Sequence, residues 1–328
     1  MNETSYRSAH SALAFFDASK RFGRVAAKGP DAIDLLHRMS TNDLLPLIGK
    51  EGSGAQTVLT TEKGRIIDLL QVLSLGNEAL LVTSGGYEEE VIAWLDKYVI
   101  MEDAKYENVS KDISQFLIFG PQSLSFLQEL SRENLIALEQ FHFITTNIAD
   151  VEVRLQKTHR IIESGFTIFC NFNDEAKVKE HFVSAITSHG GAEIDDDTFE
   201  ALRIEAGIPL APNELNGKHN PLETTLVQAI SWTKGCYIGQ EVIARLDTYD
   251  KVQRHMMGIE LQNGKDQTPL AILSSDGAEI GEITSIAFSP SMNKNIGLAF
   301  VKTAFANPGA EVMAGGIGAK LVKLPFDI

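Results

Sequence analysis

The chain of 328 residues contains only two cysteines, Cys170 and Cys236. They form no CxxC pair, and two thiolates cannot supply the four ligands that an iron–sulfur cluster needs. One chain therefore cannot hold an iron–sulfur cluster through four cysteines of its own. So few cysteines are typical of a protein in a reducing compartment, and we expect a cytoplasmic location.

Long hydrophobic runs are also missing. No apolar stretch approaches the roughly 20 residues that a membrane-spanning helix needs. The first residues, 1–16, lack a basic stretch followed by an apolar core, so we expect no signal peptide. We therefore expect no membrane partner.

Basic side chains are scarce relative to acidic ones. The chain has 29 Lys and Arg against 44 Asp and Glu, which gives a formal net charge of −15. Binding along a nucleic-acid backbone needs a basic face. We expect no direct nucleic-acid partner, although a few arginines can still bind a small anionic ligand.

Several sequence motifs of common enzyme classes are absent. No GxGxxG follows a predicted strand, and neither GxxxxGK[ST] nor GxSxG occurs. The eight histidines show no HxH or HExxH spacing, so we expect no metal site. His219 precedes Asn220-Pro221 in a predicted loop, where we expect it to face solvent; the alternative is that it lines a ligand channel.

What the sequence does contain begins with two similar units. A strand, a Gly-Pro pair and an amphipathic helix follow one another around Gly29-Pro30 and again around Gly120-Pro121. Proline in the first helical turn is favourable because its missing N–H would be unpaired there. The two units predict two related α+β lobes, over residues 1–110 and 111–253. The alternative is coincidence, since Gly-Pro is common before helices. Periodicity predicts further strands over 66–73, 79–83 and 166–171, and helices over 88–99, 176–189 and 198–206.

The pattern of apolar residues along the sequence changes near Gln253. Short apolar segments alternate with Gly, Pro, Asn and Asp, and helical periodicity is lost. Six short strands at this spacing predict a small antiparallel β-barrel over residues 254–328. The expected strands are 256–261, 270–274, 282–288, 296–301, 311–314 and 320–324.

The segment KGCYIGQE, residues 234–241, is the most informative stretch. Gly235 and Gly239 flank Cys236 and allow the backbone to bend and to approach a ligand closely. Helical periodicity starts at Gln240, which places the thiol just before a helix N-terminus with Lys234 nearby. Both features would lower the pKa of the thiol. The alternative is that Cys236 is a small buried hydrophobic residue.

This segment, followed by Val-Ile-Ala-Arg at 242–245, resembles the signature of the YgfZ-type folate-binding proteins, relatives of the glycine-cleavage T-protein. Further blocks match in order: GPDA at 29–32, STND at 40–43, LRIEAGIP at 202–209, Glu214 and NPLE at 220–223. The resemblance implies an α+β fold of two related lobes around a central channel that binds tetrahydrofolate, with a C-terminal antiparallel barrel.

The resemblance also implies a function. YgfZ-type proteins support the assembly or maintenance of iron–sulfur proteins, including radical enzymes that modify tRNA. The implied partners are iron–sulfur client or assembly proteins together with a folate. Transferases of the wider superfamily usually carry Asp where this chain has Cys236, so the resemblance implies that Cys236 is the functional thiol.

Folate-binding residues follow from the same resemblance. A carboxylate can accept N–H groups at the pterin edge, and arginine can pair with the carboxylates of the glutamate tail. The residues carried over by these matches are Glu163, Arg203, Glu205, Lys234, Gly235, Tyr237, Gly239 and Gln240. For Arg203 and Glu205 the alternative is an ion pair within the chain, at a domain junction.

One position departs from the transferase pattern. Transferases carry a reactive Asp in Gly-x-x-x-Asp-Asp-Leu, whereas here the strand from Gly64 reads Asp68-Leu69. Neighbours on a strand face opposite sides, so Asp68 is not expected to replace the missing carboxylate unless a one-residue bulge intervenes. Loss of that charge weakens folate-dependent aminomethyl transfer. Two alternatives remain: a folate-dependent aminomethyltransferase or demethylase that uses Asp68, and a non-catalytic scaffold.

Overall fold

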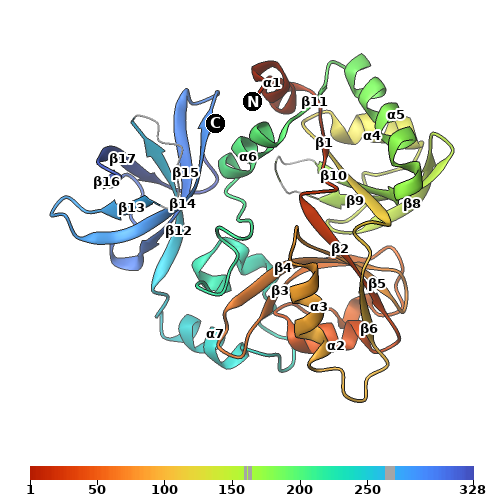
Figure 1. Ribbon diagram of the computed structural model, residues 1–328, viewed down its shortest axis with the longest axis horizontal. Coiled ribbons are helices and arrows are strands. Elements are labelled where there is room, and N and C mark those ends of the chain that lie inside the picture. The colour runs from red at the N-terminus through yellow and green to blue at the C-terminus, as the bar shows by residue number, and fades with distance from the viewer. Residues whose placement is uncertain (159–160, 162–164, 263–269) are drawn as a thin grey trace.

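The computed structural model describes residues 1–158, 161, 165–262 and 270–328. Two β-sheets with flanking helices lie on one side of the molecule, and a closed barrel lies on the other (Figure 1). The predicted α+β fold with a C-terminal antiparallel barrel is confirmed. Within the described residues, no helix is long and apolar enough to cross a bilayer.

The first sheet has the strand order β3-β4-β5-β2-β6. Its strands are β2 (Phe22–Lys28), β3 (Gly54–Thr60), β4 (Ile66–Ser74), β5 (Ala79–Ser84) and β6 (Lys105–Asn108). Helices α2 (Ala32–Met39) and α3 (Glu88–Asp96) cover one face, and the short helix η1 (Leu45–Leu47) follows α2. Leu35, Leu36 and Met39 recur at helical spacing, so α2 buries one apolar stripe in the core of this lobe.

The second sheet has the order β11-β1-β7-β10-β9-β8. Its strands are β1 (Ala14–Asp17), β7 (Ile113–Phe119), β8 (Phe143–Ile148), β9 (Val151–Thr158), β10 (Gly165–Asn171) and β11 (Ala192–Glu193). The helices of this part are α1 (Glu3–Ser11), α4 (Ser123–Ser131), η2 (Phe172–Asp174) and α5 (Glu175–Ser188). Because β1 pairs with β7 and β11, the N-terminal strand belongs to this sheet although its residues were predicted within 1–110. The domain limits stay a prediction.

Both Gly-Pro units form as expected. Gly29 and Gly120 connect strand to helix with φ of 96° and 117°, a conformation that favours glycine. A Cβ at Gly29 would lie 2.2 Å from the carbonyl oxygen of Asp103, and one at Gly120 would lie 2.6 Å from that of Ala12. Each glycine therefore has a steric reason as well as a conformational one.

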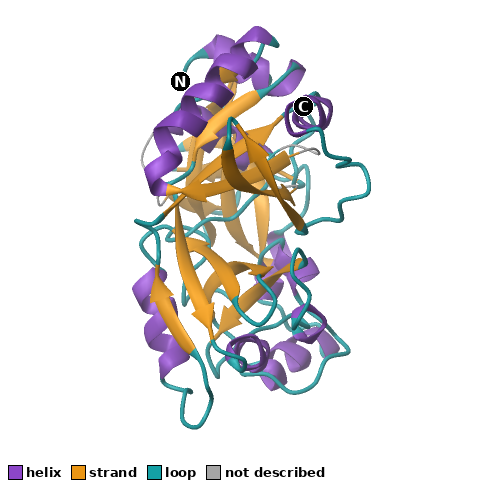
Figure 2. Cartoon of the chain, turned by 90° about the vertical axis from the view of Figure 1, so that its right-hand side faces the viewer, coloured by secondary structure: helices purple, strands orange, loops and turns teal. Residues whose placement is uncertain are grey.

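A connecting segment links the second sheet to the barrel. It contains α6 (Asp196–Glu205), η3 (Pro221–Glu223), η4 (Leu226–Ala229) and α7 (Gln240–Thr248). Figure 1 shows α6 between the barrel and the second sheet, and Figure 2 shows the layers from the side. Phe199 and Leu202 of α6 join the apolar core that the two sheets share. The connecting segment is thus positioned to enclose space between the three parts.

The barrel closes in the order β12-β15-β14-β13-β16-β17, with every pairing antiparallel. Its strands are β12 (Arg254–Leu261), β13 (Leu270–Leu273), β14 (Glu279–Ser289), β15 (Lys294–Lys302), β16 (Glu311–Ala314) and β17 (Ile317–Val322), with η5 (Thr303–Phe305) after β15. Each of the six predicted strands has its counterpart.

Candidate functional site

A cavity of roughly 340 Å³ lies where the connecting segment meets the first sheet and the chain end after the barrel. Leu69 of β4 and Ser84 of β5 form part of one wall. Residues 206–210, which follow α6, form another, and Leu324 and Pro325 contribute from the C-terminal end. This volume lies in the range of small-molecule sites.

The chemistry of the walls is mainly apolar. Aromatic and aliphatic side chains predominate, and the amides of Gln56, Gln140 and Gln228 add donors and acceptors. Among the described lining residues Arg203 carries the formal charge, and none is Asp or Glu. Such walls can bind a flat heterocycle through apolar contacts and amide hydrogen bonds.

Leu69 and Asp68 face different surroundings. Leu69 lines the cavity, whereas Asp68 does not line it and is fully buried. The register shifts between Leu59 and Thr60, which leaves Ile67 as an extra residue on β4. This bulge does not bring Asp68 to the wall, because its carboxylate bonds to Ser84 on β5. An aliphatic side chain therefore occupies the position at which the transferase motif has an acid.

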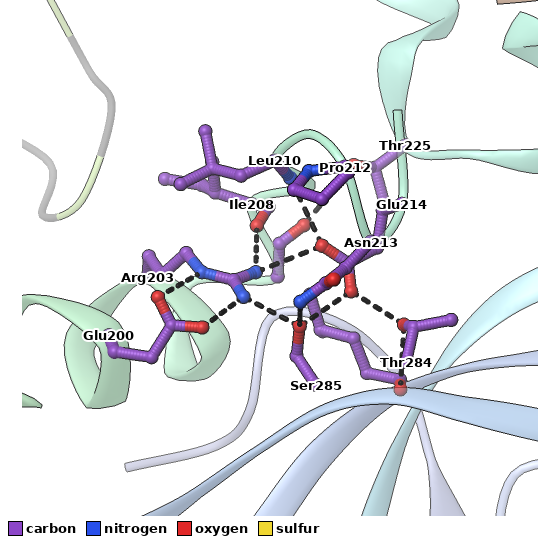
Figure 3. Close-up of polar contacts among 12 residues, drawn as sticks. Glu200, Arg203, Ile208, Leu210, Pro212, Asn213, Glu214, Thr225, Thr284 and Ser285 are labelled. Atoms are coloured by element: carbon purple, nitrogen blue, oxygen red, sulfur yellow. Dashed lines mark hydrogen bonds and ion pairs between the residues drawn. The ribbon is translucent and has the colours of Figure 1, made fainter. Parts of the chain in front are cut away.

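Arg203 is almost completely buried at the junction of α6 and the barrel (Figure 3). Its guanidinium bonds to both carboxylate oxygens of Glu200 and, at 3.2 Å, to Oε2 of Glu214. It also donates to Oγ of Ser285 at 2.6 Å and to the carbonyl oxygen of Ile208 at 3.0 Å. Burial alone would lower the pKa of Arg203, but the bond to Glu200 and the charge of Glu214 raise it.

Glu214 completes this network. Its Oε1 accepts from the hydroxyls of Thr284 at 2.5 Å and Ser285 at 2.7 Å, both on β14. Its Oε2 accepts from the backbone N–H of Leu210 at 3.1 Å, beside the cavity. The geometry supports the alternative interpretation of Arg203, an ion pair within the chain at a domain junction. A contact between Arg203 and folate stays a prediction.

Glu205 faces the N-terminal helix. Its Oε1 accepts from the hydroxyl of Tyr6 at 2.5 Å, and Oε2 lies 3.4 Å from Nε2 of His10. Burial, together with the bond to Glu205, raises the pKa of Tyr6 to about 12. Glu205 is not among the residues that line the cavity. Its contacts join α6 to α1.

The side chain of Lys234 caps the C-terminal end of α2. Its Nζ donates to the carbonyl oxygens of His37 at 2.5 Å, Ser40 at 2.8 Å and Asn42 at 2.7 Å. These carbonyls lie at and after the C-terminus of α2, where a helix leaves its last carbonyls without a partner within the helix and where a positive charge is favourable. Burial lowers the pKa of Lys234 to about 8. The ammonium is thus directed at α2, nearly 200 residues earlier in the chain.

Comparison with known proteins identifies the family. Residues 2–234 match the model of the GCVT N-terminal domain, and residues 254–327 match that of the glycine cleavage T-protein C-terminal barrel domain. The chain belongs to the glycine-cleavage T-protein family.

Similar proteins of this family carry transferase names. An aminomethyltransferase of Halalkalibacterium halodurans is 30% identical over 95% of this chain and 86% of that protein. A putative chloroplastic transferase of Arabidopsis thaliana is 28% identical over 90% of this chain, which spans 66% of the plant protein. The crystal structure of the glycine cleavage system aminomethyltransferase T from Bartonella henselae superposes with a TM-score of 0.84. It covers 98% of this chain and 88% of that one at 21% identity, which shows the shared T-protein fold.

Within this T-protein-family chain, the remainder of the KGCYIGQE segment packs on the first lobe. Gly239 has φ of 85°, and a Cβ there would lie 2.6 Å from the carbonyl oxygen of Thr61. The N–H of Ile238 donates to the backbone carbonyl oxygen of Arg38 at 3.0 Å, and the carbonyl oxygen of Ile238 accepts from the hydroxyl of Thr60 at 2.7 Å. Gly235 has open space around it. Gly239 therefore permits close approach to the chain's own β3–β4 turn. Gln240 begins α7, as predicted.

No residue from 234 to 240 lines the cavity. The structure therefore does not place Lys234, Gly235, Tyr237, Gly239 or Gln240 beside Leu69, and their contact with folate stays a prediction. Glu163 lies outside the described residues. The described residues also contain no group of three or more His, Cys, Asp or Glu side chains that could hold a metal ion.

The two cysteines differ in exposure. Cys236 is exposed, and Cys170 is buried in the core of the second lobe. Burial raises the pKa of Cys170 to about 12. The interpretation as a buried hydrophobic residue thus describes Cys170 rather than Cys236.

We expect one thiol of the native protein to react rapidly with a maleimide at pH 7.5. Cys236 is accessible, whereas Cys170 is buried and reacts only after unfolding. Mass spectrometry of the labelled protein counts the modified thiols. Cys236→Ser should abolish the fast reaction and Cys170→Ser should leave it intact; fast labelling of Cys236→Ser would contradict the assignment.

We expect Lys234→Met to lower the free energy of unfolding by about 3 kcal/mol, because it leaves buried carbonyls without a donor. Urea unfolding followed by circular dichroism measures the change. The matched control is Lys63→Met in the exposed β3–β4 turn, which should change stability by less than about 0.5 kcal/mol. Equal effects of the two substitutions would refute the helix-capping role.

His219 corrects another expectation. It was expected to face solvent, but it is buried and its ring stacks on Phe300 of the barrel with ring centroids 3.5 Å apart. Its Nδ1 lies 3.6 Å from Oε2 of Glu223. The expectation was wrong because the barrel covers the loop, a long-range contact that local sequence does not reveal.

The Glu214 network is the part of the site that sequence analysis missed. Glu214 was noted as a matching position, but its partners Thr284 and Ser285 lie about 70 residues later, on a barrel strand. No local spacing links them. Arg203 and Glu214 lie close together in the sequence, within one matched region, and the chain has a separate barrel. These two features together are the signal that could have indicated the network.

Proposed function

We propose that this protein binds a tetrahydrofolate in the cavity beside Leu69 and Ser84 and acts in folate-dependent one-carbon transfer. The observation that carries the proposal is a mainly apolar cavity with amide side chains, enclosed between the lobes and the barrel of a T-protein fold. The name aminomethyltransferase, borne by relatives that match nearly the whole chain, supports the same activity class.

This proposal reverses the order of preference drawn from the sequence. The KGCYIGQE segment favours the iron–sulfur role, with one-carbon transfer as the alternative, whereas the names of the relatives favour one-carbon transfer. Leu69 remains relevant, because an aliphatic side chain cannot stabilise charge that develops on folate. We therefore expect aminomethyl transfer to be slower than in a protein that carries Asp at this position.

Two measurements test the proposal. Anaerobic calorimetry with tetrahydrofolate tests binding, and mass spectrometry of the folate pool after incubation with aminomethyl and methyl donors tests transfer. We expect saturable binding with one site per chain and formation of methylene- or methyl-folate. Binding without product from a broad set of donors would count against transfer. No binding at all would leave the scaffold interpretation.

A second candidate rests on the KGCYIGQE segment. We propose that, if transfer is not found, the protein is a YgfZ-type accessory factor for iron–sulfur enzymes in the cytoplasm. The supporting observation is that Cys236 is exposed in a segment held firmly by Lys234 and Gly239, with Trp232 also half exposed. A thiol in such a position is available to an iron–sulfur client or assembly protein.

Gene deletion tests this second candidate. The readouts are the activities of iron–sulfur enzymes and the level of tRNA modifications made by radical enzymes. Complementation with Cys236→Ala should fail, and Cys170→Ala is the matched control that should succeed. Normal activities in the deletion strain would refute the role, and full rescue by Cys236→Ala would remove the thiol from it.

A further inference from the structure

Asp68 joins two strands at the point where their backbone pairing stops. The pairing of β4 with β5 runs from Ser74 and Ala79 to Gln71 and Val82. Beyond it, Oδ2 of Asp68 accepts from the backbone N–H of Ser84 at 2.8 Å. The carboxylate thus replaces the ladder next to the cavity.

The other carboxylate oxygen accepts two bonds. Oδ1 of Asp68 accepts from the backbone N–H of Leu69 at 2.9 Å and from the hydroxyl of Ser84 at 2.6 Å. Leu69 and Ser84 both line the cavity, although Asp68 itself does not. Asp68 therefore reaches the cavity through Ser84.

We propose that Asp68 and Ser84 form a positioning pair. In this pair, Ser84 Oγ accepts a hydrogen bond from a ring N–H of the reduced pterin. This inference rests on the proposed function, because it takes the cavity to be the tetrahydrofolate site. A serine hydroxyl has one proton and two lone pairs. Since Asp68 takes the proton, the remaining lone pairs make Ser84 an acceptor in a wall that has no Asp or Glu among its described residues.

The pair distinguishes reduced from oxidised folates. Tetrahydrofolate carries N–H groups on the reduced ring that folate lacks, so an oriented acceptor at Ser84 favours the reduced ligand. Asp68 is a positioning residue here, because it acts on the ligand through the hydroxyl that it orients. A purely structural Asp68 would pin β5 to β4 and would leave this preference unchanged.

Asp68→Asn separates the two roles. The amide presents one oxygen and one NH₂ group to the donors on Leu69 and Ser84 that the carboxylate binds. If its oxygen accepts from the backbone N–H of Ser84, its NH₂ group faces the Ser84 hydroxyl. The hydroxyl then accepts from the amide and its proton is free to point elsewhere. The hydroxyl of Ser84 is then no longer oriented as an acceptor, although the bond to the Ser84 backbone N–H still joins β4 to β5.

The experiment is anaerobic calorimetry with tetrahydrofolate and with folate as probes. We expect Ser84→Ala to weaken tetrahydrofolate binding about tenfold and to leave folate binding unchanged. Asp68→Asn should have a similar effect, and the double variant should be no weaker than either single variant, because one residue acts through the other. Ser84→Cys, which keeps the shape with a poor acceptor, gives a second variant should Ser84→Ala fold poorly.

The matched control is Ser74→Ala. Ser74 is also buried on β4, but its hydroxyl donates to the carbonyl of Leu47 and it does not line the cavity. The Ser74→Ala variant should lose some thermal stability and keep wild-type affinity for both tetrahydrofolate and folate. Unchanged tetrahydrofolate affinity of Ser84→Ala, or additive effects in the double variant, would overturn the positioning pair while the proposed function stands. Wild-type protein that binds no tetrahydrofolate would overturn both.

Discussion

Glu214→Ala should lower the free energy of unfolding by about 4 kcal/mol, because it leaves the buried guanidinium of Arg203 without one of its two carboxylate partners. The substitution also leaves the hydroxyl of Ser285 and the backbone N–H of Leu210 without their acceptor, whereas the hydroxyl of Thr284 keeps the carbonyl oxygen of Leu298 at 3.1 Å. Since these groups lie on α6, the connecting segment and β14, we expect the barrel to loosen from the lobes. Urea unfolding, followed by circular dichroism, measures the loss.

The matched control for this prediction is Glu282→Ala on the same strand, β14. Glu282 is part-exposed and lies 3.8 Å from Arg254, so its removal should cost less than about 1 kcal/mol. A Glu214→Ala variant that loses no more than this control would show that the network does not hold the barrel in place. Replacing both charges, as in Arg203→Met with Glu214→Leu, should recover part of the stability, because Glu200 keeps Arg21 as its partner at 2.6 Å and no charge is left unpaired.

Leu69→Trp should weaken tetrahydrofolate binding by about a hundredfold, because the indole ring would occupy the cavity that the ligand needs. Leu69 is only partly buried in the apolar cluster beside the cavity, so the larger side chain can turn into open space without displacing the core. The melting temperature should therefore change little. Calorimetry and thermal unfolding of the same samples separate loss of the site from loss of the fold.

Leu69→Met is the control for the blocked cavity. It nearly conserves volume and apolar character, and we expect binding close to that of the wild type. Wild-type affinity of Leu69→Trp would place the folate site elsewhere. Equal loss in both variants would instead indicate a general sensitivity of β4.

The features that could be predicted from sequence are those with a local physical cause. Gly29 and Gly120 lie in strand-to-helix turns that need a positive φ and a close approach of two backbone segments. Both helices follow as expected. The barrel strands follow from short apolar segments between turn residues. Alternation along β4 correctly separated Leu69 from Asp68, and the bulge at Ile67 does not change that.

What could not be predicted depends on contacts between distant segments. The ammonium of Lys234 was expected to act on Cys236, but it caps α2, a helix that no local pattern connects to residue 234. Strand β1 pairs with β7 and β11, so its sheet is decided by residues about 100 and 180 positions later. The bond between Asp68 and Ser84 likewise appears only once β4 and β5 are adjacent.

Hydrogen–deuterium exchange with and without tetrahydrofolate tests the central claim most directly, since it reports both whether the ligand binds and where. We predict slower exchange in peptides that cover Leu69, Ser84 and residues 206–229, which surround the cavity. Peptides that cover Cys236 should be unchanged. Protection confined to residues 232–240, or no protection anywhere at a saturating concentration, would contradict the assignment of this cavity as the folate site.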